Sequence, residues 1–208
     1  MAFTLRKATI SDIPGIVDAH NDSFRDHPLS KRVLDPSSEH VHEFWNKSLK
    51  DELVDPNADY IVMTDPASSP PEKVVGFAKW IKPLTPESPP SPAPHPWPEG
   101  ADLAFADTFF GTIDKYHEDT MKGRPHWYLS VLGTRREYQG KGIGKELVRW
   151  GTSRADEDGA EAFVAASPAG VHLYKKMGFE ALDEIAIEGV TYLETLMLRK
   201  PNKSQQQG

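Results

Sequence analysis

The apolar residues of this chain recur with two different spacings, and the two alternate along its length. Apolar or alternating runs bounded by turn residues predict strands at residues 3–8, 59–64, 73–81, 127–132, 161–166, 179–187 and 191–198. Helical spacing predicts a first helix that begins after Ser11, which would be its N-cap. It also predicts helices at residues 38–54, 101–121, 142–156 and 169–177, and Gly178 would end the last of these. This mixed order indicates an α/β (α+β) fold: a single mixed sheet with helices on both faces.

The length of the chain fits one domain, which we place at residues 1–200, with a disordered polar tail at residues 201–208. A proline-rich segment at about residues 83–100 interrupts the alternation of strands and helices. Proline lacks an amide N–H and favours extended conformations, so this segment cannot join a strand ladder. We expect it to be an exposed insertion that contributes little to the core, and we expect residues 66–71 to be a hairpin loop.

Residues 127–145 combine an apolar strand, a basic glycine-rich turn and the start of a helix. Gly140, Gly142 and Gly144 lack a Cβ atom, so backbone N–H groups there can approach a bound group closely. The first turn of a helix adds unpaired N–H groups and the positive end of the helix dipole. Basic residues also outnumber acidic ones over residues 135–149, in a chain of net charge −7. These features predict a seat for a phosphate or pyrophosphate.

Three glycine-rich motifs compete for this turn. A P-loop needs G-x-x-x-x-G-K-[ST], but Gly140 and Gly144 are one residue too close and Glu146 stands where the hydroxyl belongs. A dinucleotide-binding turn needs G-x-G-x-x-G, and here the third glycine comes one residue early. The third pattern, Q/R-x-x-G-x-G/A, is matched by Gln139, Gly142 and Gly144. A glycine-rich turn without a ligand stays open at this point.

Composition narrows the class of protein. The chain has no cysteine, which excludes disulfides, a thiol nucleophile and cysteine metal sites. No apolar run approaches membrane length, and the first residues lack the apolar stretch of a signal peptide. The net negative charge of the chain argues against a nucleic-acid partner. We therefore expect a soluble cytoplasmic protein with no membrane and no nucleic-acid partner.

The third glycine pattern resembles the coenzyme A pyrophosphate loop of the GNAT acetyltransferase superfamily. Three further segments resemble that family in the right order: the opening LRKATISDIPGI, the later AASPAGVHLYKKMGF and the closing pair of strands. The resemblance covers roughly residues 3–198, with the proline-rich segment as an insertion. It implies a mostly antiparallel sheet whose central parallel pair splays apart, acetyl-CoA as the acyl donor, and no metal.

The resemblance also implies how the coenzyme is held. In the family the pantetheine arm hydrogen-bonds to the backbone of the splayed strand, which corresponds to Leu132, Gly133 and Thr134. The side chain of Gln139 would support the turn. Arg136 stands where the family usually has proline, and we expect it to leave the turn intact and to be free for a phosphate contact. The pyrophosphate would bind the amides of Gly140, Lys141, Gly142, Ile143, Gly144 and Lys145.

The resemblance puts a catalytic acid on Tyr174, the tyrosine of its L-Y-x-x-x-G-F segment. A phenol near the coenzyme sulfur can protonate the departing thiolate. A packing role, with the hydroxyl bonded to a carbonyl, is the alternative. Ser167 matches a position that contacts the pantetheine, and it is equally suited to cap the following helix.

The sequence leaves the general base open. In arylalkylamine acetyltransferases, members of the same superfamily, two histidines on the central strand are bases, and the matching positions here are Tyr128 and Ser130. Neither is a good base at neutral pH. A water chain to a carboxylate or to His126 remains as an alternative, although a strand-edge histidine is more often structural.

The resemblance places the amine site between the first two helices, the inserted segment and the closing strands. Phe24, Trp45, Tyr128 and Ser130 are our candidates there; further aromatic and charged candidates are His27, Phe109, Phe110, Tyr116, Glu118 and Asp119. Aromatic rings with carboxylates suit a cationic amine with an apolar group. Each of these residues is equally explained as core or as a solvated helix face.

These observations predict an N-acetyltransferase that transfers an acetyl group from acetyl-CoA to the primary amine of a small molecule, by direct attack in a ternary complex. Two alternatives stay open: a non-catalytic acyl-CoA-binding module on the same fold, and transfer to a protein or peptide amine. We expect a monomer or a homodimer.

Overall fold

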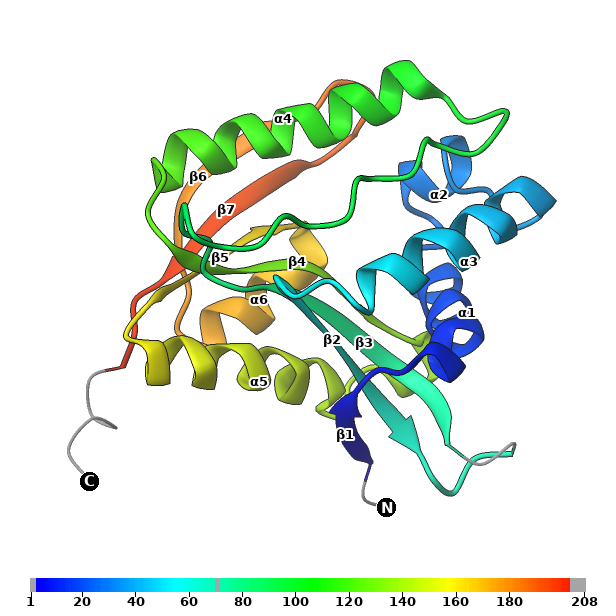
Figure 1. Ribbon diagram of the computed structural model, residues 1–208, viewed down its shortest axis with the longest axis horizontal. Helices are drawn as coiled ribbons and strands as arrows, with labels where there is room; N and C mark the ends of the chain where they lie inside the picture. Colours follow the sequence, from blue (N-terminus) through cyan, green and yellow to red (C-terminus); the bar gives the residue numbers. More distant parts are fainter. Residues whose placement is uncertain (1–2, 70–71, 203–208) are drawn as a thin grey trace.

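The strands of the protein form one mixed sheet, seen in the computed structural model that describes residues 3–69 and 72–202 (Figure 1). Within those residues the sheet has seven strands in the order β1-β2-β3-β4-β5-β7-β6, and only β4 and β5 pair in parallel. The strands are β1 (Thr4–Lys7), β2 (Ala58–Asp65), β3 (Lys73–Ile81), β4 (His126–Thr134), β5 (Glu161–Ala166), β6 (Glu180–Ala186) and β7 (Leu193–Arg199). The predicted fold class is confirmed.

The helices cover both faces of this sheet (Figure 1). They are α1 (Ile13–Ser23), α2 (Pro28–Arg32), α3 (Glu39–Glu52), α4 (Leu103–Met121), α5 (Ile143–Asp158) and α6 (Pro168–Lys176), with short 3-10 turns η1 (Ile10–Asp12) and η2 (Arg136–Tyr138). Helices α5 and α6 pack on one face, while α1, α3 and α4 lie on the other. Among the described residues, no helix is both long and apolar enough to cross a membrane.

The boundaries differ from the predicted ones mainly near the N-terminus. Helix α2 was not predicted, because five residues are too few to show helical spacing. Ser11 is not the N-cap of the first helix but lies inside η1, and Asp12 caps α1 instead. Two hydrogen bonds of 2.7 Å from the Arg6 guanidinium hold Asp12, which also accepts from the backbone N–H of Thr9. Gly178 follows α6 with φ of +88°, as predicted for a helix end.

Two parts of the predicted domain fall wholly or partly outside the described residues. The loop at residues 66–71 does join β2 to β3, but residues 70–71 are not described. Of the predicted tail, only Pro201 and Asn202 are described, and the backbone N–H of Asn202 donates to Asp156 at 2.6 Å. The remaining tail residues, 203–208, lie outside the description, so their predicted disorder stays a prediction.

The proline-rich segment is exposed over most of its length but not at its C-terminal end. Trp97 is half-buried and stacks between two rings, Phe44 of α3 at 5.6 Å and Phe110 of α4 at 5.2 Å. Upstream, Asn57 donates to the carbonyl of Pro89 at 2.6 Å. The prediction that the insertion adds little to the core is therefore wrong at Trp97, whose ring joins α3 to α4.

We expect Trp97→Ala to lower the free energy of unfolding by about 2 kcal/mol, roughly half the loss for a fully buried aromatic side chain, because the ring is only half-buried. Urea denaturation monitored by circular dichroism would measure the difference. The matched control is Pro92→Ala in the exposed part of the same segment, which should change stability by less than about 0.5 kcal/mol. Equal effects of both substitutions would contradict the anchoring role of Trp97.

Candidate active site

The central feature of the site is a gap between β4 and β5. The two strands pair only at the start of β4, where Tyr128 opposes Phe163 in the last paired position. Beyond that point β4 pairs with β3 alone, so its other edge has free backbone groups. Ser130 is exposed although it lies in the middle of the sheet. It also has no partner on β3, because Lys79 opposes Val131 and Trp80 opposes Leu129.

The free edge of β4 includes the three predicted pantetheine-binding positions, Leu132, Gly133 and Thr134. Leu132 and Thr134 are half-buried, and Gly133 is buried. A Cβ atom on Gly133 would lie 2.5 Å from the ring of Phe77, so glycine is required there by packing. An unpaired strand edge offers alternating donors and acceptors to any extended group placed beside it. The structure thus has an unpaired strand edge at the positions where the sequence predicted pantetheine binding.

The glycine-rich turn that follows β4 leads into α5, whose N-terminus has no side-chain cap. Gly140 and Gly142 have φ of +76° and +86°, and neither would meet any atom within 4 Å if it carried a Cβ. Gly142 is the N-cap of α5 and has no side chain to accept from the first-turn amides of Ile143, Gly144 and Lys145. The side-chain amide of Gln139 donates to the backbone carbonyl of Thr134 at 3.2 Å and closes the turn. These open N–H groups at the positive end of a helix dipole suit a pyrophosphate.

Gly144 differs from the other two glycines of the turn. Its φ is not in the left-handed region, and a Cβ there would lie 3.1 Å from the side chain of Leu173 on α6. Gly144 is therefore needed for the packing of α5 against α6 rather than for the backbone conformation of the turn.

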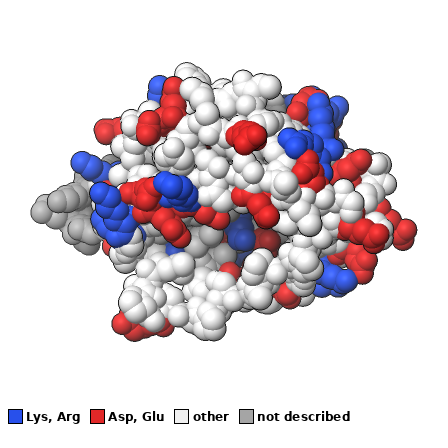
Figure 2. Space-filling view, turned by 90° about the horizontal axis from the view of Figure 1, so that it is seen from above, with Lys and Arg blue, Asp and Glu red and all other residues white. Residues whose placement is uncertain are grey.

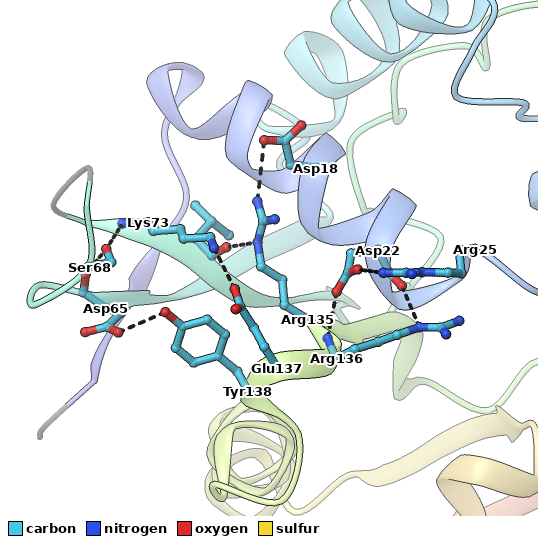
Figure 3. Close-up of polar contacts among 11 residues, drawn as sticks. Asp18, Asp22, Arg25, Asp65, Ser68, Lys73, Arg135, Arg136, Glu137 and Tyr138 are labelled. Carbon is cyan, nitrogen blue, oxygen red and sulfur yellow. Dashed lines mark hydrogen bonds and ion pairs between the residues drawn. The ribbon is translucent and has the colours of Figure 1, made fainter.

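The basic residues at the start of the turn hold it against α1 (Figure 3). Arg135 donates to the carbonyl of Val74 at 2.8 Å and faces Asp18 at 3.5 Å. The backbone N–H of Arg136 donates to Asp22 at 2.7 Å, and its guanidinium bonds the Asp22 carbonyl and Asp26. The expectation that Arg136 is free for a phosphate is corrected: its guanidinium is engaged with α1 and the residues after it.

On its other side the turn is tied to the β2–β3 hairpin (Figure 3). Glu137 pairs with Lys73 at 2.6 Å, and the hydroxyl of Tyr138 donates to Asp65 at 3.1 Å. Lys141 lies 4.5 Å from the centre of the Tyr138 ring. A pocket of about 340 Å³ adjoins the turn and is lined by Asp22, Arg25, Arg135, Arg136 and Glu137. The turn is therefore held in place before any ligand binds.

Tyr174 lies on α6, on the same side of the sheet as α5. Its ring contacts Phe179 edge-on at 5.8 Å, and Gly170 leaves room for it because a Cβ there would lie 2.7 Å from the ring. Within the described residues its hydroxyl has no hydrogen-bond partner. Burial and, to a smaller extent, the charge of Glu194 raise the Tyr174 pKa, so the phenol keeps its proton at neutral pH.

Ser167 is the N-cap of α6 by its backbone angles, with φ of −64° and ψ of 157°. Its side chain makes no capping hydrogen bond to the first turn of α6. The hydroxyl is therefore left for another partner at the end of β5, beside the gap.

The opposite side of the gap faces α4, and the surface on that side is hollowed near its middle, with atoms of both charge signs on the floor (Figure 2). Tyr128 contributes to the cluster under α4 together with Phe163 and Leu196. Burial raises the Tyr128 pKa, and the charges of Asp114 and Glu194 raise it further. Tyr128 is thus a protonated phenol and not a base at neutral pH, while its predicted place in the amine site stays a prediction.

His126 lies away from the gap. It is four residues before Ser130, roughly 13 Å along an extended strand. Its Nε2 lies 2.6 Å from Nε2 of His117, and its Nδ1 lies 2.7 Å from the carbonyl of Arg124. Both ring nitrogens are occupied, and burial lowers the pKa of both histidines. A separate pocket of about 330 Å³ is lined by this pair and by Asp114 and Tyr128, among others. His126 is not positioned to act on an amine in the gap.

The aromatic candidates divide into two groups. The rings of Trp45 and Phe24 are tilted against the ring of His20 at 4.7 Å and 4.9 Å, so both pack α1 against α3. His27 instead joins three elements: its ring is 5.5 Å from Phe109 on α4 and 6.1 Å from Tyr192 just before β7. The other candidates on α4 point elsewhere or are engaged: Phe110 stacks on Trp97, Asp119 pairs with Lys115 at 2.6 Å, and Glu118 is exposed.

One charged residue at the gap, Glu194 on β7, was missed by the sequence analysis. It is only 4% exposed, and its Oε2 atom has no hydrogen-bond partner in the described part of the chain. Burial raises its pKa to about 7, against the opposing effect of a hydrogen bond from Tyr192. The signal in the sequence was an acidic residue inside the apolar run TYLETLML. No group of three or more His, Asp or Glu residues suited to a metal ion occurs among the residues described.

Two comparisons of sequence agree with this geometry. The model of the Acetyltransferase (GNAT) family matches residues 18–179. A curated relative, the mycothiol acetyltransferase of Propionibacterium freudenreichii subsp. shermanii, is 31% identical over 93 residues, which cover 41% of this chain and 30% of that protein. The chain thus spans under a third of that relative's length.

Solved structures share the fold along nearly the whole chain. A Corynebacterium glutamicum protein described as histone acetyltransferase HPA2 and related acetyltransferase has a TM-score of 0.66 at 24% identity, with 99% of each chain covered. The PaiA N-acetyltransferase of Thermoplasma acidophilum, in complex with coenzyme A, has a TM-score of 0.60 at 15% identity, with 96% and 99% covered. A mosquito arylalkylamine N-acetyltransferase-like protein has a TM-score of 0.63 at 13% identity, with 96% and 100% covered. With the family model matching most of the chain, this protein belongs to the GNAT acetyltransferase family.

Proposed function

We propose that this protein transfers the acetyl group of acetyl-CoA to the primary amine of a small molecule, by direct attack while both substrates are bound. The observation that carries the proposal is the gap between β4 and β5, which continues into the open amides of the turn before α5. One face of this gap holds Tyr174, and the other face holds Tyr128 under α4. Two substrates can therefore approach the same point from opposite sides of the sheet.

The residues fit acetyl-CoA. The free edge of β4 from Leu132 to Thr134 would bind the pantetheine arm, and the amides of residues 140–145 would bind the pyrophosphate. The hydroxyl of Ser167, which has no hydrogen-bond partner among the described residues, would contact the same arm. Acetyl-CoA, when bound, supplies an acyl group already activated as a thioester.

Tyr174 supplies the proton for the departing sulfur. Its phenol is protonated at neutral pH and has no protein partner to compete for its hydrogen among the described residues. General acid catalysis requires the donor in its protonated form, which a raised pKa provides. Packing against Phe179 and Gly170 keeps the ring in one orientation.

A small acceptor agrees with the walls of the site better than an extended peptide does. Tyr128 is half-buried under α4, and the ring of His27 contacts Phe109 of α4. The buried carboxylate of Glu194 suits a cationic amine, since unpaired buried acids favour a positive partner. The proposal therefore excludes long polypeptide acceptors. The presence of Tyr174 as a proton donor also argues against a purely acyl-CoA-binding role.

The test is release of free thiol from acetyl-CoA, followed with a thiol reagent, across a panel of alkylamines, arylalkylamines and polyamines. The chain has no cysteine, so the protein gives no background signal. We expect amine-dependent thiol release with formation of the N-acetyl product, confirmed by mass spectrometry. Tight binding of acetyl-CoA with no turnover on any amine would favour the non-catalytic alternative, and turnover on peptides alone would favour a protein acceptor.

A further inference from the structure

Glu194 is the one buried carboxylate that faces the gap without a partner for one of its oxygens, among the residues the structure describes. The β5–β7 pairing ends at Ala166 opposite Thr195, so Glu194 lies one residue beyond it, at the mouth of the gap. Side chains alternate along a strand, and Leu196 on β7 packs under α4 with Phe163. Glu194 therefore points to the α4 side, from which the acceptor approaches.

Three tyrosines surround this carboxylate, each from a different place in the fold. Tyr192 precedes it on the chain, Tyr128 lies on β4, and Tyr174 lies on α6 across the gap. The charge of Glu194 raises the pKa of all three, so each is within electrostatic reach of it. No lysine or arginine neutralises it in the described structure, and burial is the main cause of its raised pKa. A buried carboxylate oxygen left without a donor is costly unless a ligand supplies one.

A short series of hydrogen bonds, from His27 to Tyr192, ends at Glu194. Nδ1 of His27 accepts from the backbone N–H of Leu29 at 3.2 Å, which places the proton of the neutral ring on Nε2. This Nε2 lies 2.6 Å from the hydroxyl of Tyr192, so the ring donates to the tyrosine oxygen. The Tyr192 hydrogen is then free to bond Glu194, and that bond lowers the Glu194 pKa. Burial keeps His27 neutral by lowering its pKa.

We propose that Glu194 is the general base of the reaction and that Tyr192, oriented by His27, positions its carboxylate. The inference rests on the proposed amine acetyltransferase function. The acceptor reacts as the neutral amine, so a bound ammonium first releases one proton to solvent. As the C–N bond forms and the C–S bond breaks, a second proton passes from the nitrogen to Glu194 and another passes from Tyr174 to the sulfur. The acid has then lost one proton and the base has gained one, and exchange with solvent after product release restores both.

The first test is the pH dependence of kcat/KM with an alkylamine. Wild type should gain activity as pH rises through about 7, because only the carboxylate form accepts a proton. Glu194→Gln should lose this rise and lower kcat by about 10²–10⁴-fold, the usual worth of a general base. Tyr192→Phe should shift the rise to higher pH, because it removes the hydrogen bond that lowers the Glu194 pKa. A merely structural role for Glu194 would not move the pH profile.

The second test needs no substrate. With glutamate labelled at the side-chain carboxyl carbon, NMR should show one carboxyl that titrates near pH 7 in wild type and is absent in Glu194→Gln. Should that variant fail to fold, Glu194→Asp keeps the charge on a shorter side chain and should retain both the pH rise and part of the activity. The matched control is Glu184→Gln on the exposed part of β6, which should leave both measurements unchanged.

The outcomes separate the two proposals. Wild-type rate and an unchanged pH rise in Glu194→Gln would overturn the base role of Glu194 and leave amine acetylation standing. The absence of any carboxyl titrating near pH 7 would also overturn it. A wild-type protein inert toward every amine would overturn the proposed function, and the base role with it, even if the Glu194 carboxyl titrates as expected.

Discussion

Replacing Tyr174 by phenylalanine should lower kcat by about 10²–10⁴-fold while acetyl-CoA binds almost as well as before. The substitution keeps the ring, which packs against Phe179 and Gly170, and removes only the hydroxyl. The hydroxyl has no protein partner within the described residues, so its removal leaves no buried group unsatisfied. The loss should appear in kcat more than in KM, since the proton moves as charge develops on sulfur.

The identity of the leaving group provides a second measurement. A thioester with a more acidic thiol needs less help from an acid, so it should recover part of the rate that Tyr174→Phe loses. Both kinetic constants would be measured with the two donors, and acetyl-CoA affinity would be measured separately by calorimetry. Tyr60→Phe, at a buried tyrosine on β2 outside the gap, is the matched control. If the Tyr174 variant turns over at the wild-type rate, the proton comes from elsewhere and Tyr174 has a packing role.

The raised pKa of Tyr174 also sets the alkaline behaviour of the enzyme. The acid works only while protonated, so its contribution is lost as pH rises through its pKa. Burial and the charge of Glu194 place that pKa above the ordinary tyrosine value of about 10. Deprotonation of Tyr174 should therefore cause no fall in kcat/KM below about pH 10. A fall in kcat/KM with rising pH below that value would belong to another group.

Much of the fold could be predicted because its signals are local. The strand at residues 161–166 is predicted with the bounds that β5 has, since a short apolar run covered on both faces is bounded by turn residues. The glycine turn is equally local: Gly140 and Gly142 do adopt positive φ, and α5 begins directly after them. Such features depend on residues that are neighbours in the sequence, so the sequence pattern is enough to predict them.

The features that were missed depend on residues far apart in the chain. Arg136 is engaged by Asp22 and Asp26, which precede it by more than a hundred residues. Trp97 finds its partners on α3 and α4, and no local spacing connects a proline-rich segment to either helix. Glu194 is an acid in an apolar strand, and only the fold shows that it is buried at the mouth of the gap. Long-range contacts of this kind decide the roles of single residues.

Replacing Gly142 by valine should weaken acetyl-CoA binding more than tenfold, and by up to about a hundredfold. Its φ of +86° is strained for a β-branched residue, so the turn must shift to relieve it. The shift would misplace the amides of Ile143, Gly144 and Lys145, which carry the proposed pyrophosphate site. No atom lies within 4 Å of a Cβ on Gly142, so the protein itself does not crowd the new side chain. The loss should therefore fall on binding more than on packing.

Calorimetric titration with acetyl-CoA would measure this loss, and circular dichroism would check the fold. Gly100→Val is the matched control, because Gly100 has a similar φ of +84° and equally open surroundings but lies before α4, outside the turn. Gly100→Val should introduce backbone strain similar to that of Gly142→Val and should leave acetyl-CoA affinity unchanged. Gly144→Val is less informative, since its Cβ crowds Leu173 and would disturb α6 and Tyr174 as well. Unchanged affinity in a folded Gly142 variant would mean that the turn before α5 does not hold the coenzyme.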